Sequence, residues 1–143
     1  MRSSAIVDSG PLIASANVSD PDHQISKEAL ATPGLRMVIP ALCIAEAAHF
    51  IGGRGRASAE ARFLRGLRDS DVRAPLPEEW PRMAELVEKY ADLGLGTVDA
   101  SVVVLAERLE IDLIITLDHR HFRVVRPRHF EAFRLLPAEL PMM

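Results

Sequence analysis

Two aspartates directly follow short runs of mainly apolar residues, where a carboxylate would be expected to lose its contact with water. Asp8 directly follows "AIV", and Asp118 follows "DLIITL". A carboxylate at the exit of a buried strand is costly to desolvate unless a partner neutralises its charge. Both residues are therefore candidates for a site that binds a cation.

Two further acids lie in segments with helical periodicity. Glu46 lies three residues after Cys43 and four before Phe50, which places these side chains on one helical face. We expect that face to meet the core, where an unpartnered glutamate is uncommon. Asp99 shares its helical face with Val102 but also lies in the first turn, where the helix dipole alone favours an acid. A capping role is thus an open alternative for Asp99.

Together, these four acids predict a metal site. Two carboxylates ~4 Å apart repel by about 4 kcal/mol at an effective dielectric near 20, and no lysine or arginine occupies a matching apolar position. Such a cluster needs protons or a divalent cation, and all-oxygen ligation suits Mg²⁺ or Mn²⁺ better than zinc. Because bound ions of this kind activate water for in-line displacement, phosphodiester hydrolysis is the leading hypothesis.

The surrounding elements alternate in type, which predicts an α/β fold with a parallel sheet covered on both faces. Ligands of such sheets lie beyond the carboxyl ends of the strands, where Asp8 and Asp118 should meet. Ser58 and Thr97 are the expected N-caps of two helices. No repeat or linker divides the chain, so we expect a single domain over residues 1–143. Strands are expected at 4–8, 35–40, 72–76, 112–117 and 133–137, and helices at 10–17, 20–31, 40–50, 58–69, 81–93 and 97–110.

Composition excludes several classes of protein. The chain has 143 residues, 48% of them hydrophobic and 26% charged, as in average globular domains. No apolar run approaches the roughly 20 residues that span a bilayer, and the N-terminus lacks a signal peptide's apolar core. We therefore expect a cytoplasmic protein without membrane contact. Cys43 is the only cysteine and is expected to be a small buried hydrophobe rather than a nucleophile.

The net charge of −3 does not indicate a nucleic-acid binder, but its distribution is uneven. Two basic segments could hold a phosphate backbone or form ordinary solvated surface, and charge alone favours the latter. The first contains Arg54, Arg56, Arg62, Arg65 and Arg68, and the second contains Arg120, His121, Arg123, Arg126, Arg128 and His129.

Four motifs in order, "IVDSGPLIA", "IPALCIAEAAHF", "LGLGTVDASVVVLAERL" and "IITLDHRHF", resemble the PIN-domain ribonucleases, and among these the VapC-type toxins of toxin–antitoxin pairs. The resemblance spans about Ala5 to Phe122. It implies a three-layer α/β/α sandwich with a central parallel sheet and a Mg²⁺- or Mn²⁺-dependent endoribonuclease. It further implies that the metal-binding catalytic acids are Asp8, Glu46, Asp99 and Asp118, that Thr116 supports this catalytic set by hydrogen bonding, and that Ser9 is the small polar residue after the first acid.

The same resemblance implies a homodimer, an RNA substrate and a cognate VapB-like antitoxin that occludes the site, often with an arginine. One departure concerns the additional acid that some PIN domains carry just after the last aspartate. Here that stretch reads "HRHF", and His119 and His121 are expected on the surface of a loop. A second metal ion would then depend on substrate phosphates and water. The alternative function is a non-catalytic module of the same fold that binds RNA or a protein partner, for which a repulsive acid cluster has no use.

Overall fold

The computed structural model describes residues 3–138 and contains a five-stranded sheet. The strand order is β3-β2-β1-β4-β5, and every neighbouring pair is parallel. Each strand predicted from the sequence is present, although the third, fourth and fifth are shorter than expected. The strands are β1 (Ser3–Val7), β2 (Leu35–Pro40), β3 (Asp71–Arg73), β4 (Leu113–Ile115) and β5 (Arg134–Leu136).

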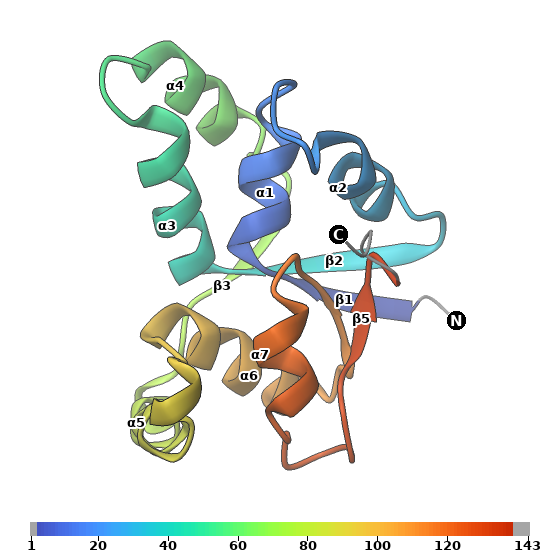
Figure 1. Cartoon of the computed structure of the whole chain (residues 1–143), viewed down its shortest axis with the longest axis vertical. Coiled ribbons are helices and arrows are strands. Elements are labelled where there is room, and N and C mark those ends of the chain that lie inside the picture. Colours follow the sequence, from blue (N-terminus) through green and yellow to red (C-terminus); the bar gives the residue numbers. More distant parts are fainter. Residues whose placement is uncertain (1–2, 139–143) are drawn as a thin grey trace.

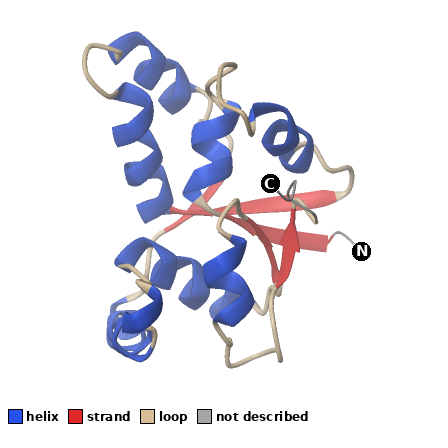
Figure 2. Cartoon of the chain, in the orientation of Figure 1, coloured by secondary structure: helices blue, strands red, loops and turns tan. Residues whose placement is uncertain are grey.

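Helices cover both faces of the sheet, which gives the predicted three-layer α/β/α arrangement (Figures 1 and 2). Helices α1 to α4 form one layer, and α5 to α7 form the other. Within residues 3–138, no helix is both long and apolar enough to cross a bilayer. The bounds are α1 (Ser9–Ser15), α2 (His23–Leu30), α3 (Ala41–Gly52), α4 (Ala57–Arg65), α5 (Trp80–Lys89), α6 (Thr97–Leu109) and α7 (His119–Val124), with 3-10 turns at Pro77–Glu79 and Ala91–Leu93.

Two apolar cores lie on opposite faces of the sheet. Successive side chains of a strand alternate between its faces, so Ala5 and Val7 of β1 join the core under α1 to α4, whereas Ile6 joins the core under α5 to α7. All three are fully buried. Burial on both faces explains why the sequence of this strand is continuously apolar rather than alternating.

Helix α7 was not predicted, and the expectation that His119 and His121 lie on a loop surface was wrong. Asp118 caps this six-residue helix by accepting a hydrogen bond from the backbone N–H of His121 at 3.1 Å. Phe122 is fully buried and packs edge-on against Phe133, with ring centroids 6.2 Å apart. The helix is thus held by a cap and one tertiary anchor, and it is too short to show a periodic pattern in the sequence.

The N-cap predictions were wrong by one or two positions, because α4 follows Arg56 and α6 follows Gly96, so Ser58 and Thr97 are already helical. The predicted core face of α3 was wrong in part. Cys43 is buried as expected, but the buried stripe continues at spacings of four through Ala47 and Ile51, and Phe50 is 57% exposed. Glu46 consequently lies half-buried at the margin of the core rather than inside it.

Candidate metal centre

The carboxyl ends of the neighbouring strands β1 and β4 bring Asp8 and Asp118 to one edge of the sheet. Val7 and Ile115 are register partners, and the next residue, Asp8, donates its backbone N–H to the carbonyl of Ile115 at 2.9 Å. Each aspartate then caps the helix that follows it. Asp8 Oδ1 accepts from the backbone N–H of Ser9 at 2.8 Å, as Asp118 does from α7. Helix N-termini favour negative charge, which helps to make both carboxylates tolerable there.

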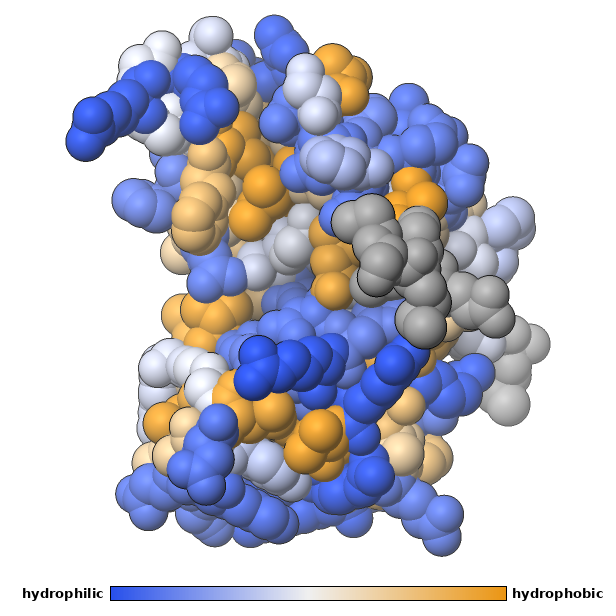
Figure 3. Space-filling model, viewed as in Figure 1, coloured by the Kyte–Doolittle hydropathy of each residue, from blue (hydrophilic) through white to orange (hydrophobic). Residues whose placement is uncertain are grey.

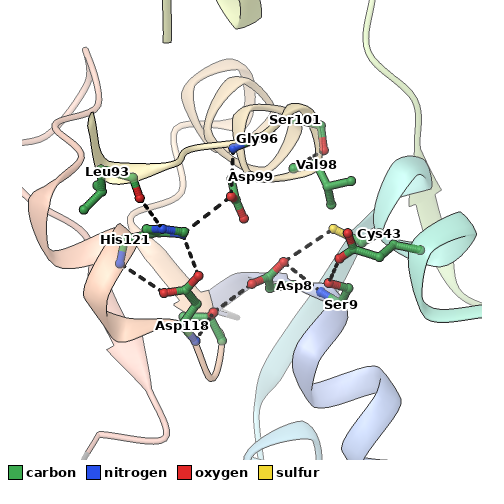
Figure 4. A network of polar contacts seen from close by, with 12 residues as sticks. Asp8, Ser9, Cys43, Leu93, Gly96, Val98, Asp99, Ser101, Asp118 and His121 are labelled. Carbon is green, nitrogen blue, oxygen red and sulfur yellow. Dashed lines mark hydrogen bonds and ion pairs between the residues drawn. The ribbon is translucent and has the colours of Figure 1, made fainter. Parts of the chain in front are cut away.

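The other two acids approach from the helical layers on either side. Glu46 of α3 accepts a hydrogen bond from the Ser9 hydroxyl, which links α3 to α1. Asp99 Oδ2 accepts from the backbone N–H of Gly96 at 3.1 Å, so Asp99 caps α6 and also faces the site (Figure 4). The structure brings all four predicted acids to a single pocket of about 460 Å³, lined by Asp8, Ser9, Gly10, Glu46, Asp99, Leu117 and Asp118.

Thr116 lies beneath this pocket and connects two of the acids. Its side chain is fully buried. The Thr116 hydroxyl donates to Asp8 Oδ2 at 2.8 Å and accepts from the backbone N–H of Asp118 at 2.9 Å. The hydroxyl therefore holds the first acid and the start of α7 in a fixed relation, and the resemblance to PIN-domain ribonucleases implies a hydrogen bond of this kind.

The electrostatics of the pocket favour a cation. Burial raises the pKa of Asp8 from 3.8 to about 6, and the charges of Asp99 and Glu46 add to this effect, although hydrogen bonds from Thr116 and Ser9 oppose it. Burial is also the main reason why the pKa of Asp99 is raised. No lysine or arginine lines the pocket within residues 3–138. An oxygen-rich pocket in which burial opposes the ionisation of Asp8 and Asp99 fits a divalent cation.

Sequence analysis missed His121 as a member of this cluster. Its Nδ1 lies 2.6 Å from Asp118 Oδ2 and 3.6 Å from Asp99 Oδ2. Nε2 of the same ring lies 2.8 Å from the carbonyl oxygen of Leu93. His121 follows Asp118 by three residues, a spacing that places two side chains on one face of a helix. This spacing could have indicated the contact only if α7 had been predicted to be helical.

Cys43 is fully buried, as expected, but it also contacts the site. Its Sγ donates to Asp8 Oδ1 at 3.8 Å. Burial, followed by the negative charges of Asp8 and Glu46, raises the pKa of this thiol well above its usual value. Cys43 is therefore a protonated thiol that packs against the acids, rather than a nucleophile.

Comparisons with known sequences assign the chain to a family. The sequence profile of the PIN domain matches residues 5–127, and the chain belongs to this family. Ribonuclease VapC26 of Mycobacterium tuberculosis is 31% identical over 134 residues, which cover 92% of this chain and 99% of that protein. The resemblance to VapC-type PIN domains inferred from the sequence motifs is thereby confirmed.

Solved structures show the same fold. The crystal structure of Mycobacterium tuberculosis VapC20, described as a sarcin–ricin loop cleaving toxin, superimposes with a TM-score of 0.70 at 16% identity, over 77% of this chain and 86% of that one. VapBC2 from Rickettsia felis, crystallised with a DNA fragment from its promoter, gives a TM-score of 0.63 at 14% identity, over 92% and 96% of the two chains. At these identities the likeness extends to the architecture alone.

Proposed function

We propose that this protein is a divalent-metal-dependent endoribonuclease that hydrolyses RNA phosphodiester bonds with an activated water, and that it is the toxin of a VapBC-type pair. The observation that supports it most is the convergence on one pocket of four acids, from the residue after β1, from α3, from α6 and from the start of α7. Membership of the PIN-domain family and the similarity to Ribonuclease VapC26 support the same reaction.

The residues of the pocket have distinct roles in this proposal. Asp8, Glu46, Asp99 and Asp118 would hold Mg²⁺ or Mn²⁺, which when bound supplies a water of lowered pKa and charge stabilisation for the leaving oxygen. Thr116 keeps Asp8 Oδ2 in place through its hydrogen bond of 2.8 Å. Ser9 fixes the Glu46 carboxylate in the same way from the first turn of α1.

A cleavage assay with RNA tests the proposal directly. We expect protein treated with EDTA to be inactive, added Mg²⁺ or Mn²⁺ to restore cleavage, and Glu46→Gln to lose it. Asp92→Asn is the matched control, because Asp92 is an exposed acid outside the pocket. Binding of RNA without cleavage under every metal condition would instead support the non-catalytic module.

The proposal includes an antitoxin of the VapB type as partner. A hollow of about 510 Å³ lies between α1, α2 and α4, where Phe63 and Leu67 line it beside Arg62. Figure 3 shows hydrophobic residues among hydrophilic ones on the surface of both helical layers. In this layer, Val18, Leu64 and Phe50 are exposed. Such a surface suits an amphipathic helix with acidic residues. The product of a small adjacent gene should bind the protein and inhibit cleavage.

We also expect the protein to be a homodimer, as the resemblance to VapC-type toxins implies, and to be cytoplasmic, as the sequence analysis predicts. Light scattering after size exclusion measures the mass of the free protein, which should be twice the chain mass of 15.7 kDa. A monomeric mass would contradict this part of the proposal and leave the ribonuclease activity untouched.

A further inference from the structure

His121 is arranged in the way that metal-binding histidines commonly are. Its Nε2 lies 2.8 Å from the carbonyl oxygen of Leu93, which can only accept a hydrogen bond, so Nε2 carries a proton. A neutral ring then has its lone pair on Nδ1. Metal-ligating histidines usually donate their other ring N–H to a backbone carbonyl or carboxylate, which fixes the tautomer and the orientation of the ring.

The free nitrogen faces two acids. Nδ1 lies 2.6 Å from Asp118 Oδ2 and 3.6 Å from Asp99 Oδ2. Despite the short distance to Asp118, Nδ1 is buried and makes no hydrogen bond of good geometry within the described residues. A ring nitrogen that lies close to two carboxylates without a well-aligned hydrogen bond is in the arrangement expected when the nitrogen and the carboxylate oxygens bind the same cation.

The three side chains are close enough to share one ion. One ligand atom each from Asp99, Asp118 and His121 lies within 4.8 Å of the others. Atoms bound ~2.1 Å from a single ion are at most about 4.2 Å apart, so only a small movement of a side chain is needed. The three residues come from the N-terminal turns of α6 and α7, at the edge of the pocket (Figure 4).

We propose that His121 Nδ1 is a metal ligand, and that Asp99, Asp118 and His121 form a cation position with two oxygens and one nitrogen. The inference deepens the proposed ribonuclease site and rests on it only for the role of the ion in catalysis. Imidazole nitrogen suits Fe²⁺, Ni²⁺ and Zn²⁺ best, and Mn²⁺ binds most weakly of the first-row transition metals. Mg²⁺ prefers oxygen ligands alone, so a nitrogen ligand disfavours it more than it disfavours Mn²⁺. His121 therefore makes the site selective for Mn²⁺ over Mg²⁺.

Pulsed electron paramagnetic resonance of the Mn²⁺-loaded protein, without RNA, tests the ligand directly. We expect coupling between Mn²⁺ and a ¹⁴N nucleus, replaced by a ¹⁵N signal when the protein is labelled with ¹⁵N-histidine. Loss of the coupling in His121→Gln assigns it. The matched control is His129→Gln, because His129 Nε2 also lies 2.8 Å from a backbone carbonyl, that of Ile111, but this residue does not line the acid pocket.

Affinities supply a second measurement. His121→Gln should weaken Mn²⁺ binding by about tenfold or more, the loss that follows disturbance of a metal-binding histidine, and should change Mg²⁺ binding much less. Absence of histidine coupling in the unmodified protein, or its survival in His121→Gln, would overturn the inference even if RNA is cleaved. Histidine coupling without any RNA cleavage would leave this metal position standing and refute the ribonuclease proposal.

Discussion

At the scale of single residues, Asp8 carries the clearest electrostatic signature of the site. It is 5% exposed, and its pKa of about 6 lies well above its ordinary value because of burial and of neighbouring acids. Cation binding requires the ionised carboxylate, so a proton and the metal compete for the same group. Metal affinity should therefore fall as the pH decreases through about 6, which titration of Mn²⁺ binding between pH 5 and pH 8 would measure.

The same group makes the stability of the metal-free protein depend on pH. Because the pKa of Asp8 is raised in the folded state, its stabilising contribution is complete below pH 3.8 and is lost as the pH rises through about 6. Between pH 5 and pH 8 this loss is about 1.5 kcal/mol. Asp8→Asn should abolish RNA cleavage and remove this part of the pH dependence, and so be the more stable protein at pH 8. Chemical denaturation in EDTA checks both, and parallel stability curves would contradict the assignment.

Thr116 offers a second test at this scale. Thr116→Val keeps the shape but removes the hydroxyl that contacts Asp8 and the backbone of Asp118. Leaving the partly buried N–H of Asp118 without an acceptor should cost about 1 kcal/mol of folding free energy or more. We also expect at least about a tenfold loss in the rate of cleavage, equivalent to 1.4 kcal/mol. Thr116→Ser retains the hydroxyl and should keep most of the activity. Equal activity in the two variants would show that the hydroxyl does not organise the site.

At the scale of elements, α7 is the segment on which the outer side of the pocket depends. Asp118 and His121 belong to its N-terminal end, and Phe122 fixes it to the core under α5 and α6. Phe122→Ala should lower the free energy of unfolding by about 3–5 kcal/mol and weaken metal binding as α7 loosens. Val124→Ala, at a residue of the same helix that is 49% exposed, should change stability by about 0.5 kcal/mol or less. Denaturation and Mn²⁺ titration of both variants measure this.

The elements also show which parts of the structure sequence reasoning can reach. Continuous apolar runs predicted the strands, and their carboxyl ends placed Asp8 and Asp118 at one edge, since both features follow from local pattern and parallel topology. Helix α7 was not predicted because a six-residue helix has less than two turns of periodicity. Its stability comes from Phe122, which packs against Phe133, a residue distant in sequence. The contact of His121 with Asp99 and Asp118 depends on α7 and was missed with it.

At the scale of the whole molecule, charge is distributed so that only part of the basic surface is free for RNA. Arg128 of the second basic segment donates to Glu85, and its backbone N–H to Glu107. Arg120, by contrast, is exposed, lies just past Asp118, and has no side-chain partner within residues 3–138. We therefore expect this arginine to contact phosphate while Arg128 serves the fold.

The salt dependence of RNA binding distinguishes these roles. Loss of one phosphate contact to single-stranded RNA lowers the slope of log K against log salt by about 0.7. Arg120→Ala should show this decrease and bind RNA more weakly, whereas Arg128→Ala should leave the slope unchanged. Fluorescence anisotropy with a labelled RNA and a catalytically inactive background such as Asp8→Asn measures both. An unchanged slope for Arg120→Ala would assign this arginine to ordinary surface.

The buried thiol of Cys43 beside Asp8 can report on local opening of the structure at this edge of the sheet. Cys43 is the sole cysteine and is fully enclosed, so a maleimide can reach it only when α3 lifts away from the end of β1. The labelling rate then measures transient openings of the sheet edge that carries the acids, without an engineered probe. A cation bound by both Glu46 and Asp8 should lower the rate at which the maleimide labels Cys43. Equal labelling rates with and without Mn²⁺ would mean that the ion does not stabilise this edge against opening.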